Sequence, residues 1–306
     1  MRLYFELPHE TKVQWKRNER NARGFFDDEL TKQRRDWKEC LDVGVPGSLD
    51  WSLPDEDPRN ACLDGFNQFP PSSILPDFRA VVIDYFEQCT VLSKKLASLM
   101  GRCLNMDKDP FLSDLAQHHT SYLRMNYYPP CAYEEPLGIS PHHDAGFLTV
   151  LLQDDSCHSL QVLNGHNEWV TVEPVPGALT INTGDMAMIW SNGAYRAPLH
   201  RVLTDKVKVR YSAPFFYNPP YTTKITPFVS DGECVYEPCL WGYFRAVRFA
   251  GDLTDFGVEI QSSDYKKTQK SPHIEKQARF EEKAHFHEPF SVEKYRPLLQ
   301  NEQPIA

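Results

Sequence analysis

The sequence predicts a mostly β protein with flanking helices, whose core is an antiparallel sandwich or jelly roll. Two observations carry this prediction: short apolar runs crowd the middle of the chain, and turn residues separate them. The runs are residues 122–127, 147–152, 160–163, 178–182, 186–190 and 209–217. Each has the length of a strand, so we expect the core to occupy residues 119–220.

Turn-forming pairs stand between these runs, which supports the assignment of separate strands. The pairs are Pro129-Pro130, Asn164-Gly165, Pro176-Gly177, Thr183-Gly184 and Asn192-Gly193. Asn-Gly is a strong signal for a tight hairpin, so we expect the strands on either side of Asn164 to pair with each other.

Segments with other patterns flank this core. Residues 1–76 are polar and irregular, with a Pro- and Asp-rich loop from residue 46 onward. Residues 77–118 are expected to form a long helix with Asp77 as its N-cap, and one face of it should pack on the sheet. That face comprises Phe78, Val82, Tyr85, Phe86, Cys89, Leu92, Leu96, Leu99 and Cys103. Residues 221–306 form a helical and irregular extension, with a charged helix at 275–286.

Composition narrows the function classes. The 306-residue chain has a formal net charge of -9, which argues against nucleic-acid binding because phosphate recognition needs a basic surface. No stretch reaches the roughly 18 apolar residues of a membrane span, and the start has no signal-peptide pattern. The eight cysteines are scattered and include no CxxC pair. We therefore expect a cytoplasmic protein, monomeric, without membrane or nucleic-acid partners.

A candidate metal site begins at Pro141-His142-His143-Asp144. On a strand, residues two apart point to the same face, so His142 and Asp144 project together and His143 points away. A distant histidine, His200, can complete a set of two imidazoles and one carboxylate. That facial set leaves metal positions open, as in non-haem iron(II) oxygenases.

A second constellation is Arg210-Tyr211-Ser212, in which Arg210 and Ser212 share a strand face. The guanidinium fork of arginine matches a carboxylate, and the serine hydroxyl adds a bond. Alone, either constellation is more often structural. Their order along a strand-rich chain favours an iron site beside a site for a dicarboxylic co-substrate.

Several segments carry a family resemblance. They are residues 122–130, His142-x-Asp144, and residues 149–154, 160–162, 181–185, 191–195, 199–202 and 210–219. With these, the chain resembles the 2-oxoglutarate and iron(II)-dependent dioxygenases, in the branch that contains isopenicillin N synthase and the plant flavonoid and gibberellin oxidases. Residues 23–26 and 35–39 resemble the family's N-terminal domain. The chain opens partway through that domain, as either a short protein or a truncated sequence would.

The resemblance implies a double-stranded β-helix, the cupin-like form of the jelly roll, with residues 1–76 as a partial N-terminal dioxygenase domain. It implies that His142, Asp144 and His200 bind Fe(II), and that Asn126 and Tyr128 join Arg210 and Ser212 around 2-oxoglutarate. The implied reaction uses O2, converts 2-oxoglutarate to succinate and CO2, and hydroxylates, desaturates or cyclises a small metabolite. Ascorbate is a candidate reductant.

Two alternatives stay open at this point. A relative could use iron and oxygen without 2-oxoglutarate; Arg210-x-Ser212 occurs in such enzymes too, whereas Asn126-x-Tyr128 favours the 2-oxoglutarate users. A non-catalytic binding protein on a jelly-roll scaffold would be expected to have lost a metal ligand, and here all three are present. The sequence does not name the organic substrate.

Overall fold

The computed structural model describes residues 1–18, 21–32, 34–45, 65–106, 108–131, 137–154, 156–229, 232–253 and 259–283. Most of the loop expected after residue 46, and residues 284–306 of the expected C-terminal extension, lie outside these ranges. Within the described ranges, no helix combines the length and the apolar character that crossing a lipid bilayer requires.

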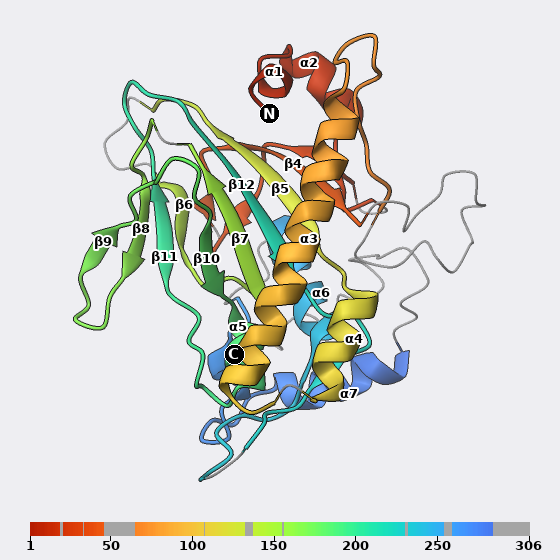
Figure 1. The fold of residues 1–306 in the computed structure, drawn as a ribbon, viewed down its shortest axis with the longest axis vertical. Helices are drawn as coiled ribbons and strands as arrows, with labels where there is room; N and C mark the ends of the chain where they lie inside the picture. The colour runs from red at the N-terminus through yellow and green to blue at the C-terminus, as the bar shows by residue number, and fades with distance from the viewer. Residues whose placement is uncertain are drawn as a thin grey trace, which may run out of the picture.

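Two antiparallel sheets form the core, as the sequence predicted (Figure 1). The larger has the order β1-β4-β5-β12-β7-β10, and the smaller has the order β6-β11-β8-β9. The strands of the larger sheet are β1 (Gly24–Phe26), β4 (Glu39–Gly44), β5 (Tyr122–Tyr128), β12 (Arg210–Tyr217), β7 (Leu148–Gln153) and β10 (Thr180–Thr183). Those of the smaller are β6 (Leu137–His142), β11 (His200–Leu203), β8 (Leu160–Leu163) and β9 (Trp169–Thr171).

One predicted strand is wrong: residues 186–190 belong to helix α5 (Asp185–Trp190). Met186, Ala187, Ile189 and Trp190 are all buried, and a short run that is buried on every side shows no period that separates strand from helix. Gly184 is the N-cap of this helix and packs tightly against the segment that contains Gly146. A Cβ added at Gly184 would lie 2.2 Å from the Gly146 carbonyl oxygen.

The N-terminal region is more ordered than its polar composition suggested. It contains helices α1 (Arg2–Phe5) and α2 (His9–Lys12), the 3-10 turn Val13–Trp15, and the two-stranded β2 (Leu30–Thr31) and β3 (Arg34–Arg35). Strand β4 pairs with β5 over six residues, so this region extends the larger sheet. Tyr4 and Phe25 are fully buried in the core. The expectation of an irregular segment is therefore corrected.

Residues 77–118 hold two helices rather than one, α3 (Phe78–Cys103) and α4 (Pro110–His118). Helix α3 lies across the larger sheet, where the Phe86 ring meets Phe215 with centroids 4.9 Å apart (Figure 1). Asp77 precedes α3 with φ +60° and makes no side-chain cap, contrary to its expected role. The predicted face is right up to Cys89, and Leu92 and Leu96, which are half-buried, also pack against the core. Beyond it the buried positions are the small residues Ser93, Ala97 and Gly101, whereas Leu99 and Cys103 are exposed.

The hairpin predicted at Asn164-Gly165 is confirmed between β8 and β9. Its loop is longer than a two-residue turn, since β8 ends at Leu163 and β9 begins at Trp169. Within the loop, the Asn164 Oδ1 accepts hydrogen bonds from the backbone N–H groups of His166 and Glu168. The left-handed residue is Asn167, with φ +61°. Beyond the core lie β13 (Lys224–Ile225), β14 (Cys239–Leu240), α6 (Trp241–Leu253), the 3-10 turn Ser262–Tyr265 and α7 (His273–Lys283).

Candidate metal centre and its two pockets

Three predicted ligands meet where two strands of the smaller sheet pair. His142 ends β6 and His200 begins β11, and the two residues are directly opposite in register. Asp144 lies two residues beyond the end of β6. Its Oδ1 is 3.8 Å from His142 Nε2 and 3.5 Å from His200 Nε2. One donor atom from each residue falls within a 4.8 Å group, the spacing of ligands around one ion.

Hydrogen bonds orient all three donors toward a common point. His142 Nδ1 donates to the Ser140 carbonyl oxygen at 2.8 Å, and His200 Nδ1 donates to that of Pro198 at 3.1 Å. Each ring therefore carries its proton on Nδ1 and presents the Nε2 lone pair to the centre. His143 instead donates to the Ala197 carbonyl oxygen at 3.0 Å and is not part of the donor group.

The carboxylate of Asp144 is held from behind by two residues to which the sequence analysis gave no role. Thr149 Oγ1 donates to Asp144 Oδ2 at 2.6 Å, and Asn182 Nδ2 donates to the same oxygen at 2.7 Å. This leaves Oδ1 for a metal. Both residues stand in segments that carry the family resemblance, and that position was the only signal by which sequence could have found them.

The charge state of the centre suits a divalent ion. Burial, and then the neighbouring His200, lower the pKa of His142 to about 3. Burial alone would raise the Asp144 pKa, but His200, His142 and the two hydrogen bonds outweigh it and keep that pKa below its ordinary value. Two neutral imidazoles and one carboxylate are the donor set of non-haem iron(II) sites, so the residues fit that metal.

The first pocket at this centre, which we name the apolar pocket, contains all four residues predicted to bind 2-oxoglutarate. Asn126, Tyr128, Arg210 and Ser212 line it together with the three candidate ligands. Its remaining wall is largely aliphatic and includes Leu151, Leu160, Val162 and Val202.

Arg210 is the single cation in the lining of the apolar pocket. It is only 2% exposed, and its guanidinium lies over the Tyr128 ring at 5.0 Å. One contact, at 3.4 Å, joins it to Gln153, whereas its Nε and Nη1 have no hydrogen-bond partner among the described residues. A buried guanidinium with spare donors needs an anion, and a carboxylate matches its geometry.

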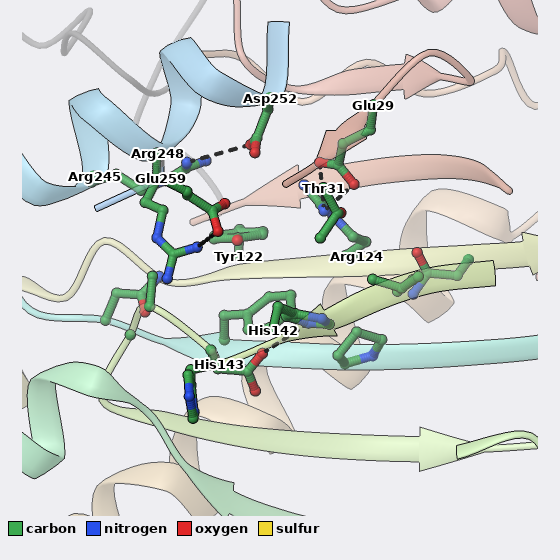
Figure 2. A pocket seen from close by; sticks show the side chains of 18 of the residues that line it. Glu29, Thr31, Tyr122, Arg124, His142, His143, Arg245, Arg248, Asp252 and Glu259 are labelled. Carbon is green, nitrogen blue, oxygen red and sulfur yellow. Dashed lines mark hydrogen bonds and ion pairs between the residues drawn. The ribbon is translucent and has the colours of Figure 1, made fainter. Parts of the chain in front are cut away.

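A second pocket meets the same centre from another direction, and we name it the charged pocket (Figure 2). His142 and Asp144 line it, as they line the apolar pocket. Its ionic side chains are Glu29, Lys38, Arg124, Arg245, Arg248, Asp252 and Glu259. They come from the N-terminal region, from β5, from α6 and from the segment beyond it, and the sequence analysis assigned none of them a role.

Comparisons with known proteins agree with this site. Residues 119–219 match the model of the 2OG-Fe(II) oxygenase superfamily, and residues 1–72 match the N-terminal model of non-haem dioxygenases in morphine synthesis. The first match covers every candidate ligand. The chain belongs to the 2OG-Fe(II) oxygenase superfamily, which confirms the predicted family and the predicted double-stranded β-helix.

The nearer relatives are plant enzymes. The chain is 34% identical to jasmonate-induced oxygenase 2 of Arabidopsis thaliana over 80% of its own length and 64% of the relative's. It is 31% identical to homoarginine-6-hydroxylase 2-ODD-C23 of Glycine max, over 74% of its own length and 70% of the relative's. The crystal structure of JOX2 in complex with 2OG, Fe and JA matches with TM-score 0.68 and 30% identity, over 80% and 70%. The chain covers 48% of jasmonate-induced oxygenase 3, so it spans about half to two thirds of the first relatives.

Proposed function

We propose that the protein is a 2-oxoglutarate-dependent non-haem Fe(II) oxygenase that oxidises a C–H bond of a small organic molecule. One observation carries the proposal: the triad of donors lies where two pockets meet, and one of those pockets contains a buried arginine with spare donors. A metal, an anionic co-substrate and an organic substrate can therefore share one centre. The family membership and the solved relative that holds 2OG and Fe support this assignment.

His142, Asp144 and His200 are assigned to the iron. The backbone carbonyls of Ser140 and Pro198 fix the two imidazoles, so little reorganisation is needed when the ion binds. When bound, the iron supplies the oxidising chemistry with O2, while 2-oxoglutarate is converted to succinate and CO2.

Arg210, Ser212, Asn126 and Tyr128 are assigned to 2-oxoglutarate. The Arg210 fork and the Ser212 hydroxyl would hold its far carboxylate. The Asn126 Nδ2 donates to Ser212 Oγ at 3.2 Å and thereby orients that hydroxyl. The aliphatic wall limits the access of water and strengthens each charged hydrogen bond, because the local dielectric constant is low.

The proposal also covers the domain organisation of the chain, its cellular location and its oligomeric state. We assign residues 1–76, 77–118, 119–220 and 221–306 to the N-terminal, helical, catalytic and C-terminal parts of a monomer. The described cysteines are all free, which supports a cytoplasmic, reducing location. The organic substrate is assigned to the charged pocket.

The test is to measure succinate formation and anaerobic Fe(II) binding in the wild type and in His200→Ala. We expect succinate only when both Fe(II) and 2-oxoglutarate are supplied, and we expect loss of both signals in the variant. His166→Ala is the matched control, since this exposed histidine lies in the β8–β9 loop. Unchanged turnover in His200→Ala would refute the assignment, and product formation without 2-oxoglutarate would favour the oxidase alternative.

A further inference from the structure

The charged pocket contains more ionic side chains than a site for a neutral metabolite requires, and they do not all have the same role. Figure 2 shows Arg245, Arg248 and Asp252, all on α6, on the opposite side of the cavity from His142. The positions Trp241, Arg245, Arg248 and Asp252 are spaced by four, three and four, so one face of α6 lines the pocket.

Arg124 is already committed to the fold. Its Nε and Nη2 donate to the two carboxylate oxygens of Asp42 at 2.8 and 2.9 Å. Its Nη1 donates to both oxygens of Glu29, at 2.8 and 2.9 Å. Lys38 lies 2.6 Å from Glu29 and 2.8 Å from Asp36. These cations bind the N-terminal region to β5 and have little capacity left for a ligand.

Arg245 differs from them. It is only 6% exposed, and its sole ion contact in the described part of the chain is Asp252 Oδ2 at 3.8 Å, beyond hydrogen-bond distance. Its guanidinium lies 5.5 Å from the Tyr122 ring and 5.3 Å from the Phe249 ring, so its contacts in the described part of the chain are two aromatic rings and one carboxylate beyond hydrogen-bond distance.

Arg248, one helical turn further on, has a spare donor. Its Nη1 lies 2.6 Å from Glu259 and its Nη2 lies 3.4 Å from Asp185. Its buried Nε has no hydrogen-bond partner among the described residues. In the pocket that reaches His142 and Asp144, Arg248 therefore presents an unused donor, and Arg245 presents a buried guanidinium whose carboxylate contact is 3.8 Å away.

The sign of the missing charge follows from what each group can do. A guanidinium stays charged at any pH a protein tolerates, so its need for an anion is permanent. Asp252 can instead accept a proton: burial, and then the charge of Glu29, raises its pKa to about 7. The unmet requirement of the pocket is therefore for a negative group. The lining also includes Ile139, Phe216 and Trp241, which offer an apolar surface for the rest of the ligand.

We infer that the organic substrate is a small amphipathic carboxylic acid, whose carboxylate is held by Arg245 and Arg248 while its apolar body extends toward the triad. This inference rests on the proposed function. It makes Arg245 a specificity-determining residue and Arg124 a structural one.

The experiment is calorimetric titration of the full chain with 3-phenylpropanoic, cyclohexylacetic and octanoic acids, their methyl esters, and the amines of the same frameworks. The protein is loaded anaerobically with Fe(II) and saturating 2-oxoglutarate, so that Arg210 is occupied, and the titration is repeated without metal. We expect at least one acid to bind about tenfold or more tightly than its ester and amine, because a charge-assisted hydrogen bond is lost.

The variants are Arg245→Gln and Arg245→Lys, with Arg102→Gln on the exposed surface of α3 as the matched control. Arg245→Gln should weaken the acid about tenfold or more, Arg245→Lys should weaken it less, and Arg102→Gln should leave it unchanged. If Arg245→Gln does not fold, the inference is tested by the acid affinity of Arg245→Lys and by the difference between acid and ester affinity in the wild type.

Equal binding of acid and ester, preference for an amine, no binding by any acid, or unchanged affinity in both Arg245 variants would overturn the inference. The proposed function is judged separately, by succinate formed from 2-oxoglutarate in the absence of a substrate. Succinate formation without acid binding removes only the inference. Acid binding without iron-dependent succinate removes the proposed function.

Discussion

The two pockets that meet at the triad are lined by different kinds of side chain. The apolar pocket is aliphatic with one arginine in its lining, whereas the charged pocket contains four cations and three carboxylic side chains besides the triad. Every residue of the apolar pocket lies between positions 126 and 216, whereas the charged pocket draws on positions from 29 to 259. The pocket that we assign to the co-substrate is therefore local in sequence, and the pocket that we assign to the substrate is assembled from distant segments.

This difference has a functional consequence. The residues that we assign to the co-substrate lie on neighbouring strands and are fixed by the sheet register: Asn126 stands opposite Ser212, and Tyr128 stands opposite Arg210. The charged pocket, to which we assign the substrate, takes its ionic side chains from the N-terminal region, β5, α6 and the segment beyond α6, and these side chains can change without changing that register. The comparison predicts separate effects for substitutions in the two pockets and a joint effect at the triad they share.

The largest effect on metal binding is expected at Asp144, a candidate ligand that lines both pockets. Asp144→Ala removes the anionic ligand and should lower Fe(II) affinity by more than about 100-fold, beyond the loss caused by removing an outer partner of a ligand. Anaerobic metal titration measures this. Asp84→Ala, on the exposed side of α3, is the control. One iron bound per chain in Asp144→Ala would contradict the joint role.

A large effect on stability is expected in the charged pocket. Glu29→Gln removes the partner of Arg124, Lys38 and Arg17 and leaves buried cations uncompensated. Breaking a buried ion pair on one side costs about 3–5 kcal/mol of unfolding free energy. Urea unfolding measures it, with the exposed Glu10→Gln as control. The KM for 2-oxoglutarate should stay near the wild-type value in the folded variant; a raised KM would show that the two pockets are not independent.

The same carboxylate predicts a pH dependence. Burial by itself would raise the Glu29 pKa, but Arg124, Lys38 and Arg17 outweigh it and hold the pKa well below its ordinary value of 4.5. A depressed pKa in the folded state stabilises the fold above pH 4.5, and this stabilisation is lost as the pH falls from 4.5 toward the folded-state pKa. Unfolding free energy should therefore fall more steeply below pH 4.5 in the wild type than in Glu29→Gln; parallel curves would argue against this role.

A smaller effect is expected in the apolar pocket. Arg210→Met removes the charged donor and should raise the KM for 2-oxoglutarate about 10- to 100-fold, since hydrogen bonds to charged groups contribute roughly 1.5–3 kcal/mol. Arg210→Lys keeps the charge without the fork and should recover part of the loss. Steady-state succinate assays measure both, with Arg102→Met as control. An unchanged KM in Arg210→Met would place the co-substrate elsewhere.

The smallest effect is expected behind the triad. Thr149→Val keeps the shape of the side chain and removes one of two hydrogen bonds to Asp144 Oδ2. Outer partners of metal ligands contribute about 10- to 100-fold in affinity, and because Asn182 remains, we expect the lower end, about tenfold. Fe(II) titration measures it, and Thr222→Val on the exposed surface is the control. A loss as large as that in Asp144→Ala would mean that the aspartate turns away.

Strand periodicity explains much of what could be predicted. It placed Arg210 with Ser212 on one face of β12, and both line the apolar pocket. It separated His142 from His143, although Asp144 lies beyond the end of β6 rather than within it. A run that is buried on every side has no alternation of apolar and polar residues, so α5 was predicted to be a strand. Periodicity also did not indicate that β1 and β4 join the larger sheet.

The sequence by itself determined the chemistry of the centre: the residue types of the triad, the arginine–serine pair, the co-substrate they suit and the β core that carries them. These features depend on short spacings and on a period of two, which a linear chain records directly. Only the tertiary structure decided which of the other charged residues matter. Arg124 and Arg245 look alike in sequence, but Arg124 lies against two carboxylates, whereas among the described residues Arg245 has one carboxylate contact, at 3.8 Å. The partners of Arg124 lie 82 and 95 residues away along the chain, so no local pattern encodes them.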